Sequence, residues 1–144
     1  MLCLGRALVL VLLMAQLLSA ALAMDIEDVS ALSIEGTIDA TPQFQQYLSS
    51  SDRLIIKIFH PENGIEMDAK YSIVRNFQLP LKFRITPYIL MDRSTRHEKY
   101  IIEVFTDKDK DLLRIESGEL FGTTPDTIQL GSRDVKLLLN QFRK

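Results

Sequence analysis

Short apolar runs rich in β-branched residues recur along most of this chain, and turn-forming residues separate them. Runs of this length bounded by Gly, Pro, Asn, Asp and Ser are typical of β-strands. We expect strands at residues 32–38, 53–60, 70–79, 81–90, 98–106, 111–117 and 134–142, with a weaker candidate at 127–130. Residues 43–50 fit either one helical turn or a short strand. The spacing predicts an all-β fold, an antiparallel β-sandwich of about seven to eight short strands.

Apolar residues at every second position show which face of three of these strands meets the core. Successive side chains of a strand point to opposite sides of its sheet, so an alternating set shares one face. The residues expected to face the core are Leu81, Phe83 and Ile85, then Tyr100, Ile102 and Val104, then Val135, Leu137 and Leu139.

The opposite register also carries large apolar side chains, where an ordinary solvent-facing sheet would have Thr, Lys or Glu. Exposed apolar patches often mark a partner site, and an exposed sheet edge can accept a partner strand. Two other interpretations stay open: these positions lie beneath a loop or helix, or the assigned register is wrong by one residue. The candidate partner-binding residues are Ile55, Phe59, Ile101, Phe105, Leu112 and Leu138.

The first 23 residues have the pattern of a secretory signal peptide. Arg6 precedes a long apolar stretch, and Ala21 and Ala23 are small residues at the −3 and −1 positions of a cleavage site. A transmembrane anchor is the alternative, because the uncharged run at 7–24 is just long enough to span a bilayer. We expect a signal peptide at 1–23, a short linker at 24–31 and the β-sandwich domain at 32–144.

Cys3, inside the expected signal peptide, is the single cysteine of the chain. The exported domain therefore has no disulfide, no thiolate metal site and no cysteine nucleophile. Small extracellular domains of eukaryotes usually contain disulfides. A disulfide-free exported domain suits the bacterial periplasm, so we expect it there or at the periplasmic face of the outer membrane.

The charge balance is mildly acidic, with a formal net charge of −2 for the whole chain. Loss of Arg6 with the signal peptide leaves 16 basic and 19 acidic residues, a formal −3. Nucleic-acid binding requires clustered Lys and Arg, and so does attachment to anionic lipid. No such cluster is present, so neither kind of partner is expected.

The most suggestive chemical motif is Asp-Lys-Asp-Lys-Asp at residues 107–111. Its aspartates have the 1-3-5 spacing of an EF-hand loop, which also needs Gly at position 6 and Glu at position 12. Here those positions are Leu112 and Gly118. We therefore interpret the motif as the polar tip of a β-hairpin.

No other residue pattern indicates catalysis or a bound cofactor. The two histidines, His60 and His97, are isolated from each other and from any cysteine. The sequence contains no Gly-x-Ser-x-Gly nucleophile turn, and its glycines form no phosphate-binding loop. We expect no metal, no cofactor and no catalytic residues, and so a binding protein rather than an enzyme.

The order of several weak motifs resembles the YscW/YbaY family of small exported bacterial domains. Glu-Gly-Thr-Ile at 35–38 matches an early strand, and the strand at 54–59 follows it. Leu-Pro-Leu-Lys-Phe occurs at 79–83, and a Tyr-led strand at 100–106 would pair through a tight turn with 112–116. The similarity covers about residues 33–140.

The resemblance implies a β-sandwich and, for the YscW branch, a pilotin of a type III secretion system. Such a protein is a chaperone that binds the outer-membrane secretin and aids its localisation and assembly. No catalytic residues or cofactors come with the family. The alternative is a periplasmic carrier or sensor that binds a small apolar ligand between its sheets.

One position departs from the pilotin pattern. A lipoprotein has cysteine directly after its signal peptide, and here Met24 occupies that place. We therefore expect any association with the membrane to be indirect, through the partner.

Overall fold

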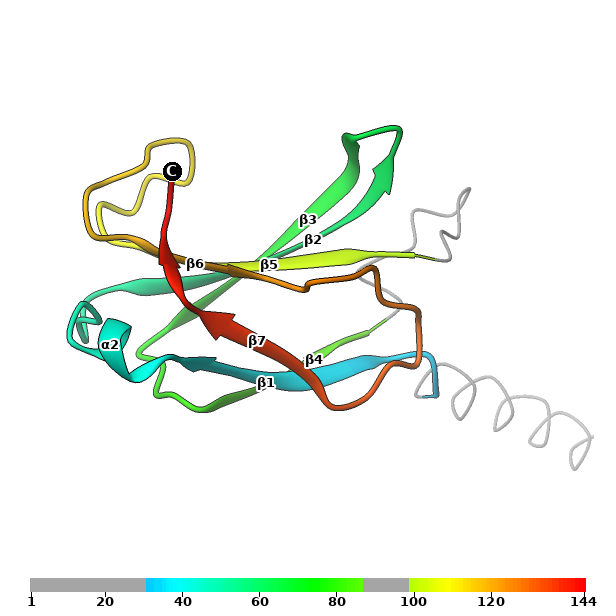
Figure 1. The fold of residues 1–144 in the computed structure, drawn as a ribbon, viewed down its shortest axis with the longest axis horizontal. Helices are drawn as coiled ribbons and strands as arrows, with labels where there is room; N and C mark the ends of the chain where they lie inside the picture. The colour runs from blue at the N-terminus through cyan, green and yellow to red at the C-terminus, as the bar shows by residue number, and fades with distance from the viewer. Residues whose placement is uncertain (1–30, 87–98) are drawn as a thin grey trace, which may run out of the picture. The chain divides into compact units, whose positions relative to one another are not determined.

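The computed structural model describes residues 31–86 and 99–144, which form eight strands and one short helix arranged as two sheets (Figure 1). This confirms the predicted all-β fold and the expected number of strands. Residues Ser33–Lys144 form a compact unit. The expected signal peptide lies outside the described residues, and so does all but the end of the linker.

The smaller sheet has the strand order β4-β1-β7. Its strands are β1 (Ile34–Ala40), β4 (Leu81–Ile85) and β7 (Val135–Leu139). β1 pairs antiparallel with β4 but parallel with β7, so the expectation of an entirely antiparallel sandwich was wrong at this one pairing. The long chain between β1 and β7 provides the crossover that a parallel pair requires.

The larger sheet has the order β3-β2-β5-β6-β8, and every neighbouring pair is antiparallel. Its strands are β2 (Arg53–Glu62), β3 (Ile65–Arg75), β5 (Ile101–Asp107), β6 (Leu120–Thr123) and β8 (Gln141–Phe142). β2 and β3 form a hairpin (green in Figure 1) whose turn, Asn63 and Gly64, has positive φ at both residues. Asn-Gly is a favoured two-residue hairpin turn for that reason.

The chain passes from one sheet to the other at Asn140, between β7 and β8. β6 approaches β7 closely at this corner: a Cβ added to Gly122 would lie only 2.1 Å from the Leu138 carbonyl oxygen. α2 (Pro42–Gln45) is a single helical turn, which decides between the two possibilities for residues 43–50.

The core lies between the sheets and contains the inward-facing sets that alternation predicts. Phe83, Ile85, Tyr100, Ile102, Val104, Leu137 and Leu139 are buried there, and Leu81 and Val135 are half-buried against the same cluster. The expected core faces are therefore confirmed in all three strands.

Residues 111–117 do not form the expected strand, and β6 pairs with β5 in their place. Aspartate side chains explain the difference, because they accept hydrogen bonds from nearby backbone amides and so favour turns. Asp109 Oδ1 accepts from the Asp111 amide at 2.9 Å, and Asp111 Oδ1 accepts from the Leu113 amide at 3.0 Å. The weaker candidate at 127–130 forms only an isolated bridge, between Ile128 and Tyr100.

Most strand boundaries differ from expectation by a few residues, and β3 and β4 differ most. β3 begins at Ile65 and ends at Arg75, whereas we expected 70–79. β4 ends at Ile85, and residues 87–90 of that prediction lie outside the described part. Within the two described ranges, no helix has the length and hydropathy needed to cross a bilayer.

Candidate functional site

A groove of about 480 Å³ lies on the face of the larger sheet that points away from the core. Its floor comes from four strands, with Lys57, Tyr71, Phe105 and Phe121 among the contributing residues. The turn at residues 112–115 and the C-terminal residues 141–144 also line it.

Strand register accounts for the apolar floor. Ile55 lies opposite Phe105, and Phe105 lies opposite Phe121, so the three residues form a row across β2, β5 and β6. Opposed residues of an antiparallel pair share one face of the sheet. Lys57 and Glu103 form the next row.

The six candidate partner-binding residues do not form one exposed surface. Ile55, Phe59 and Phe105 are buried, with at most 6% of each exposed, so the expectation that they face solvent was wrong. Ile101 and Leu112 are half-buried. Leu138 is exposed, but it belongs to β7 in the other sheet. Of the six, Phe105 and Leu112 line the groove.

Phe105 is buried because a basic side chain lies over it. The Arg143 guanidinium lies 4.0 Å from the centroid of the Phe105 ring. Similarly, the Lys57 Nζ lies 4.8 Å from the ring centroid of Phe59. These contacts show that basic side chains of the protein itself lie over the Phe59 and Phe105 rings.

Arg143 also fixes one wall of the groove. Its guanidinium donates hydrogen bonds to the carbonyl oxygens of Leu112, at 3.2 Å, and Arg114, at 3.4 Å. It donates a third to Glu119 Oε2, at 3.0 Å. Sequence reasoning missed this residue, because nothing near position 143 shows that its side chain reaches a turn some thirty residues earlier.

Lys57 carries the buried charge at the groove floor. Its ammonium donates to Glu66 and to Glu103, the latter at 3.1 Å. Burial lowers the pKa of Lys57, but the hydrogen bonds and negative charges of the two glutamates outweigh this effect and raise the pKa above the usual lysine value. The ammonium of Lys57 is thus held between two carboxylates.

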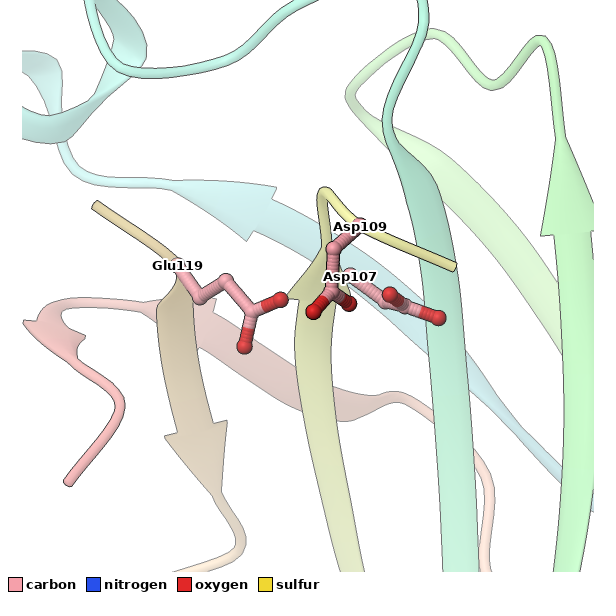
Figure 2. Close-up of side chains that lie close together, drawn as sticks. All are labelled: Asp107, Asp109 and Glu119. Atoms are coloured by element: carbon pink, nitrogen blue, oxygen red, sulfur yellow. The ribbon is translucent and has the colours of Figure 1, made fainter. Parts of the chain in front are cut away.

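Three acidic side chains, Asp107, Asp109 and Glu119, meet at the end of β5 and the start of β6 (Figure 2). One carboxylate oxygen of each lies within 4.8 Å of the others, a spacing that could hold a metal ion. Two of them belong to the Asp-Lys-Asp-Lys-Asp motif, but the third is Glu119 rather than a residue of an EF-hand pattern.

Arginines already neutralise these carboxylates. Asp107 pairs with Arg53, and Glu119 pairs with Arg143 at 3.0 Å. Asp109 pairs with Arg114 at 3.5 Å. A buried carboxylate is stable when it is paired and hydrogen-bonded, as Asp107 and Glu119 are. Asp109 differs, because its buried Oδ2 has no hydrogen-bond partner within the described residues and contacts only the largely exposed Arg114. The arrangement of the cluster suits a clamp that holds the 108–119 connection to the sheet.

His60, the histidine within the described residues, has a hydrogen-bond partner in the backbone. His60 Nδ1 donates a hydrogen bond of 2.8 Å to the Lys99 carbonyl oxygen. His97 lies outside the described residues. The expectation of a non-catalytic protein stays a prediction.

A second hollow, of about 590 Å³, lies on the smaller sheet. Glu35 lines it and pairs with Arg84, at 3.3 Å, and with Arg133, at 3.8 Å. Both hollows open mainly on outer faces of the sandwich. The alternative of a small apolar ligand held between the sheets therefore gains no support from either of them.

Comparison with known proteins gives one informative result. Neither protein-family models nor curated proteins give a match to this chain. Among solved structures, the chain is similar to an alternative pilotin from the type II secretion system of Vibrio cholerae, with a TM-score of 0.50 and 12% sequence identity. The similarity covers 78% of this chain and 97% of that one. The chain thus has a pilotin-like fold, while membership of the YscW/YbaY family stays a prediction.

Proposed function

We propose that this protein is a pilotin-like accessory protein of the bacterial envelope, which binds a secretin and aids its localisation and assembly. The shared fold with a pilotin supports the proposal. The observation that carries it is the groove on the outer face of the larger sheet, because it offers a preformed apolar surface to a segment of a partner.

Large apolar side chains stand exposed around this groove. Tyr71, Ile115 and Phe142 are 51%, 46% and 41% exposed, and Leu113 is 96% exposed. Contiguous apolar surface of this kind on a soluble domain marks an interaction site, because leaving it in water has a free-energy cost that a partner removes. The proposed role is therefore binding, without catalysis or a cofactor.

The secretion system is the finer part of the proposal. The sequence resemblance implies type III, and the similar structure belongs to a type II system. We propose a type III secretin as the partner and treat a type II secretin as the alternative that the experiment must separate. Since Met24 occupies the place of a lipidated cysteine, the protein would reach the outer membrane through its partner.

Affinity capture of the tagged protein from its native cells, after fractionation of the envelope, tests the proposal. A secretin recovered with the protein from the outer-membrane fraction supports it, and sequencing that secretin identifies the system. Recovery of the protein free of any secretin contradicts it.

A matched pair of variants tests whether the secretin binds at the groove. Leu113→Asp introduces a charge at the most exposed large apolar residue of the groove, and we expect it to abolish secretin recovery. Leu138→Asp makes the same kind of change at an exposed leucine of the other sheet and should leave recovery unchanged. Equal recovery with both variants would place the partner elsewhere.

A further inference from the structure

β3 is an edge strand of the larger sheet, and it is unusually long for an exposed edge. It has 11 residues, whereas β8 at the opposite edge has two. The edge strands of the smaller sheet, β4 and β7, have five residues each. A long edge presents a row of unpaired backbone amides and carbonyls to which another strand can pair.

A β-bulge divides β3 into two parts. The register with β2 shifts between Ile58 and His60, and Asp68 has a φ of +54° on the β3 side. Bulges twist an edge and discourage pairing across it. Beyond the bulge, residues 70–75 pair with β2 without interruption, so these six residues provide a regular edge.

This regular edge carries exposed apolar side chains. Tyr71 and Ile73 are 51% and 44% exposed, and they lie beside Lys57 and Ile55 on the outer face. Tyr71 also lines the groove, so the edge and the groove form one continuous surface. Charged side chains usually protect such an edge from association. At Tyr71 and Ile73, the outward-facing side chains are apolar instead.

Two cations flank the apolar pair. Lys70 precedes it and Arg75 follows it, and within residues 31–86 and 99–144 neither takes part in an ion pair. The edge therefore offers two positive charges separated by an apolar segment.

We propose that residues 70–75 accept an extended acidic segment of a partner protein as an added strand. Its apolar side chains would lie opposite Tyr71 and Ile73, and its carboxylates opposite Lys70 and Arg75. For a parallel added strand, the matching order of residues is acid, apolar, polar, apolar, any residue, acid. For an antiparallel added strand, the order is reversed. The inference rests on the proposed function in one respect: it gives the form in which a segment of the secretin would bind.

A second copy of the chain fits this edge poorly. When two antiparallel copies of residues 70–75 overlap fully, Lys70 lies opposite Arg75 twice. Like charges directly opposed across a strand pair are destabilising. The charges therefore favour an acidic partner strand over self-association.

The first test uses a designed peptide and the exported protein purified with ¹⁵N labelling. The probe is the acetylated and amidated peptide Asp-Val-Thr-Val-Thr-Asp, titrated to millimolar concentration while amide shifts are recorded. We expect saturable shifts concentrated at residues 70–75. The same peptide with Lys for Asp should bind at least tenfold more weakly, and the double variant Lys70→Glu/Arg75→Glu should reverse that preference. Shifts absent from β3, or indifferent to peptide charge, overturn the inference.

The second test separates this inference from the proposed function. Ile73→Lys protects the edge with a charge, and Leu138→Lys is the matched control on the other sheet. We expect Ile73→Lys to reduce secretin recovery at least tenfold and Leu138→Lys to leave it unchanged. Undiminished recovery with Ile73→Lys overturns the added strand and leaves the proposed function standing.

The remaining outcomes are also distinct. If the acidic peptide binds β3 but no secretin is recovered with any form of the protein, the edge site stands and the proposed function fails. If sedimentation shows a dimer of the unaltered protein that Ile73→Lys dissociates, a second copy occupies the edge and the inference is overturned.

Discussion

The guanidinium of Arg143 lies 4.0 Å from the centroid of the Phe105 ring and at the same time pairs with the buried carboxylate of Glu119 at 3.0 Å. A residue next to the end of the chain thus fastens the 108–119 connection to the outer face of the larger sheet. The wall of the groove depends on this contact, and its removal should have both a thermodynamic and a structural effect.

Arg143→Ala should reduce the free energy of unfolding by about 3–5 kcal/mol, because it leaves the fully buried Glu119 carboxylate without its cation. Urea denaturation measures the loss. Arg143→Lys retains a charge but not the planar stacking on Phe105. Its free energy of unfolding should lie between those of the unaltered protein and Arg143→Ala. A loss below about 0.5 kcal/mol, as for an ordinary surface substitution, would contradict the role assigned to Arg143.

Phe105→Asp should destabilise the protein by about 3–5 kcal/mol or more, because a charge would replace a ring that is 97% removed from solvent. Leu113→Asp should change stability by less than about 0.5 kcal/mol, since that side chain is almost fully exposed. Thermal unfolding of the two variants compares them directly. Similar melting temperatures would show that the outward register is exposed after all.

The raised pKa of Lys57 predicts a loss of stability at alkaline pH. Its charged form is favoured by folding, so its contribution is complete below the unfolded-state pKa of about 10.4 and is lost as pH rises through the higher folded-state pKa. The difference in unfolding free energy between the unaltered protein and Lys57→Met should therefore decrease above about pH 10.

Glu103→Gln provides the internal control for this titration, because it removes one of the two carboxylates that raise the Lys57 pKa. The alkaline decrease should become smaller in that background. Stability curves of the unaltered protein and Lys57→Met that stay parallel from neutral to strongly alkaline pH would argue against the buried ion pair.

Gly36→Ala should destabilise the smaller sheet by about 1–3 kcal/mol or more. The added methyl group would lie 2.1 Å from the Val135 carbonyl oxygen and 2.7 Å from the Phe83 ring, and one of these neighbours is backbone. Thr37→Ala, at the next position of β1, is the control and removes atoms without adding any. Equal melting temperatures for the two variants would refute the tight packing around Gly36.

Calcium should leave the melting temperature unchanged, because arginines already neutralise Asp107, Asp109 and Glu119. A ligand that binds only the native state raises the free energy of unfolding by RT ln(1 + [L]/Kd). Scanning calorimetry with millimolar calcium and then with a chelator measures the effect. An upward shift that the chelator reverses would establish a metal site at this cluster.

The fold class and the core faces could be predicted because alternation is a local property. Leu137 and Leu139 share a face whatever pairs with β7, and burying that face is what makes the strand stable. The same alternation correctly identified the apolar outer register at Ile55 and Phe105. It could not show that these two are buried, since the cover comes partly from Arg143, which is distant in sequence.

Strand order could not be predicted from local sequence patterns, for a similar reason. Residues 111–117 have a strand-like composition, but backbone amides there donate hydrogen bonds to the Asp109 and Asp111 carboxylates and so form turns. β6 takes the place beside β5. The parallel pairing of β1 with β7 joins two distant parts of the chain. Local alternation thus identifies the inward-facing side chains of the core, because their burial follows from the hydrophobic effect and a period of two. The three-dimensional arrangement of the strands sets which edge stays unpaired and which apolar groups stay in water, because pairing between distant strands depends on the packing of the whole domain.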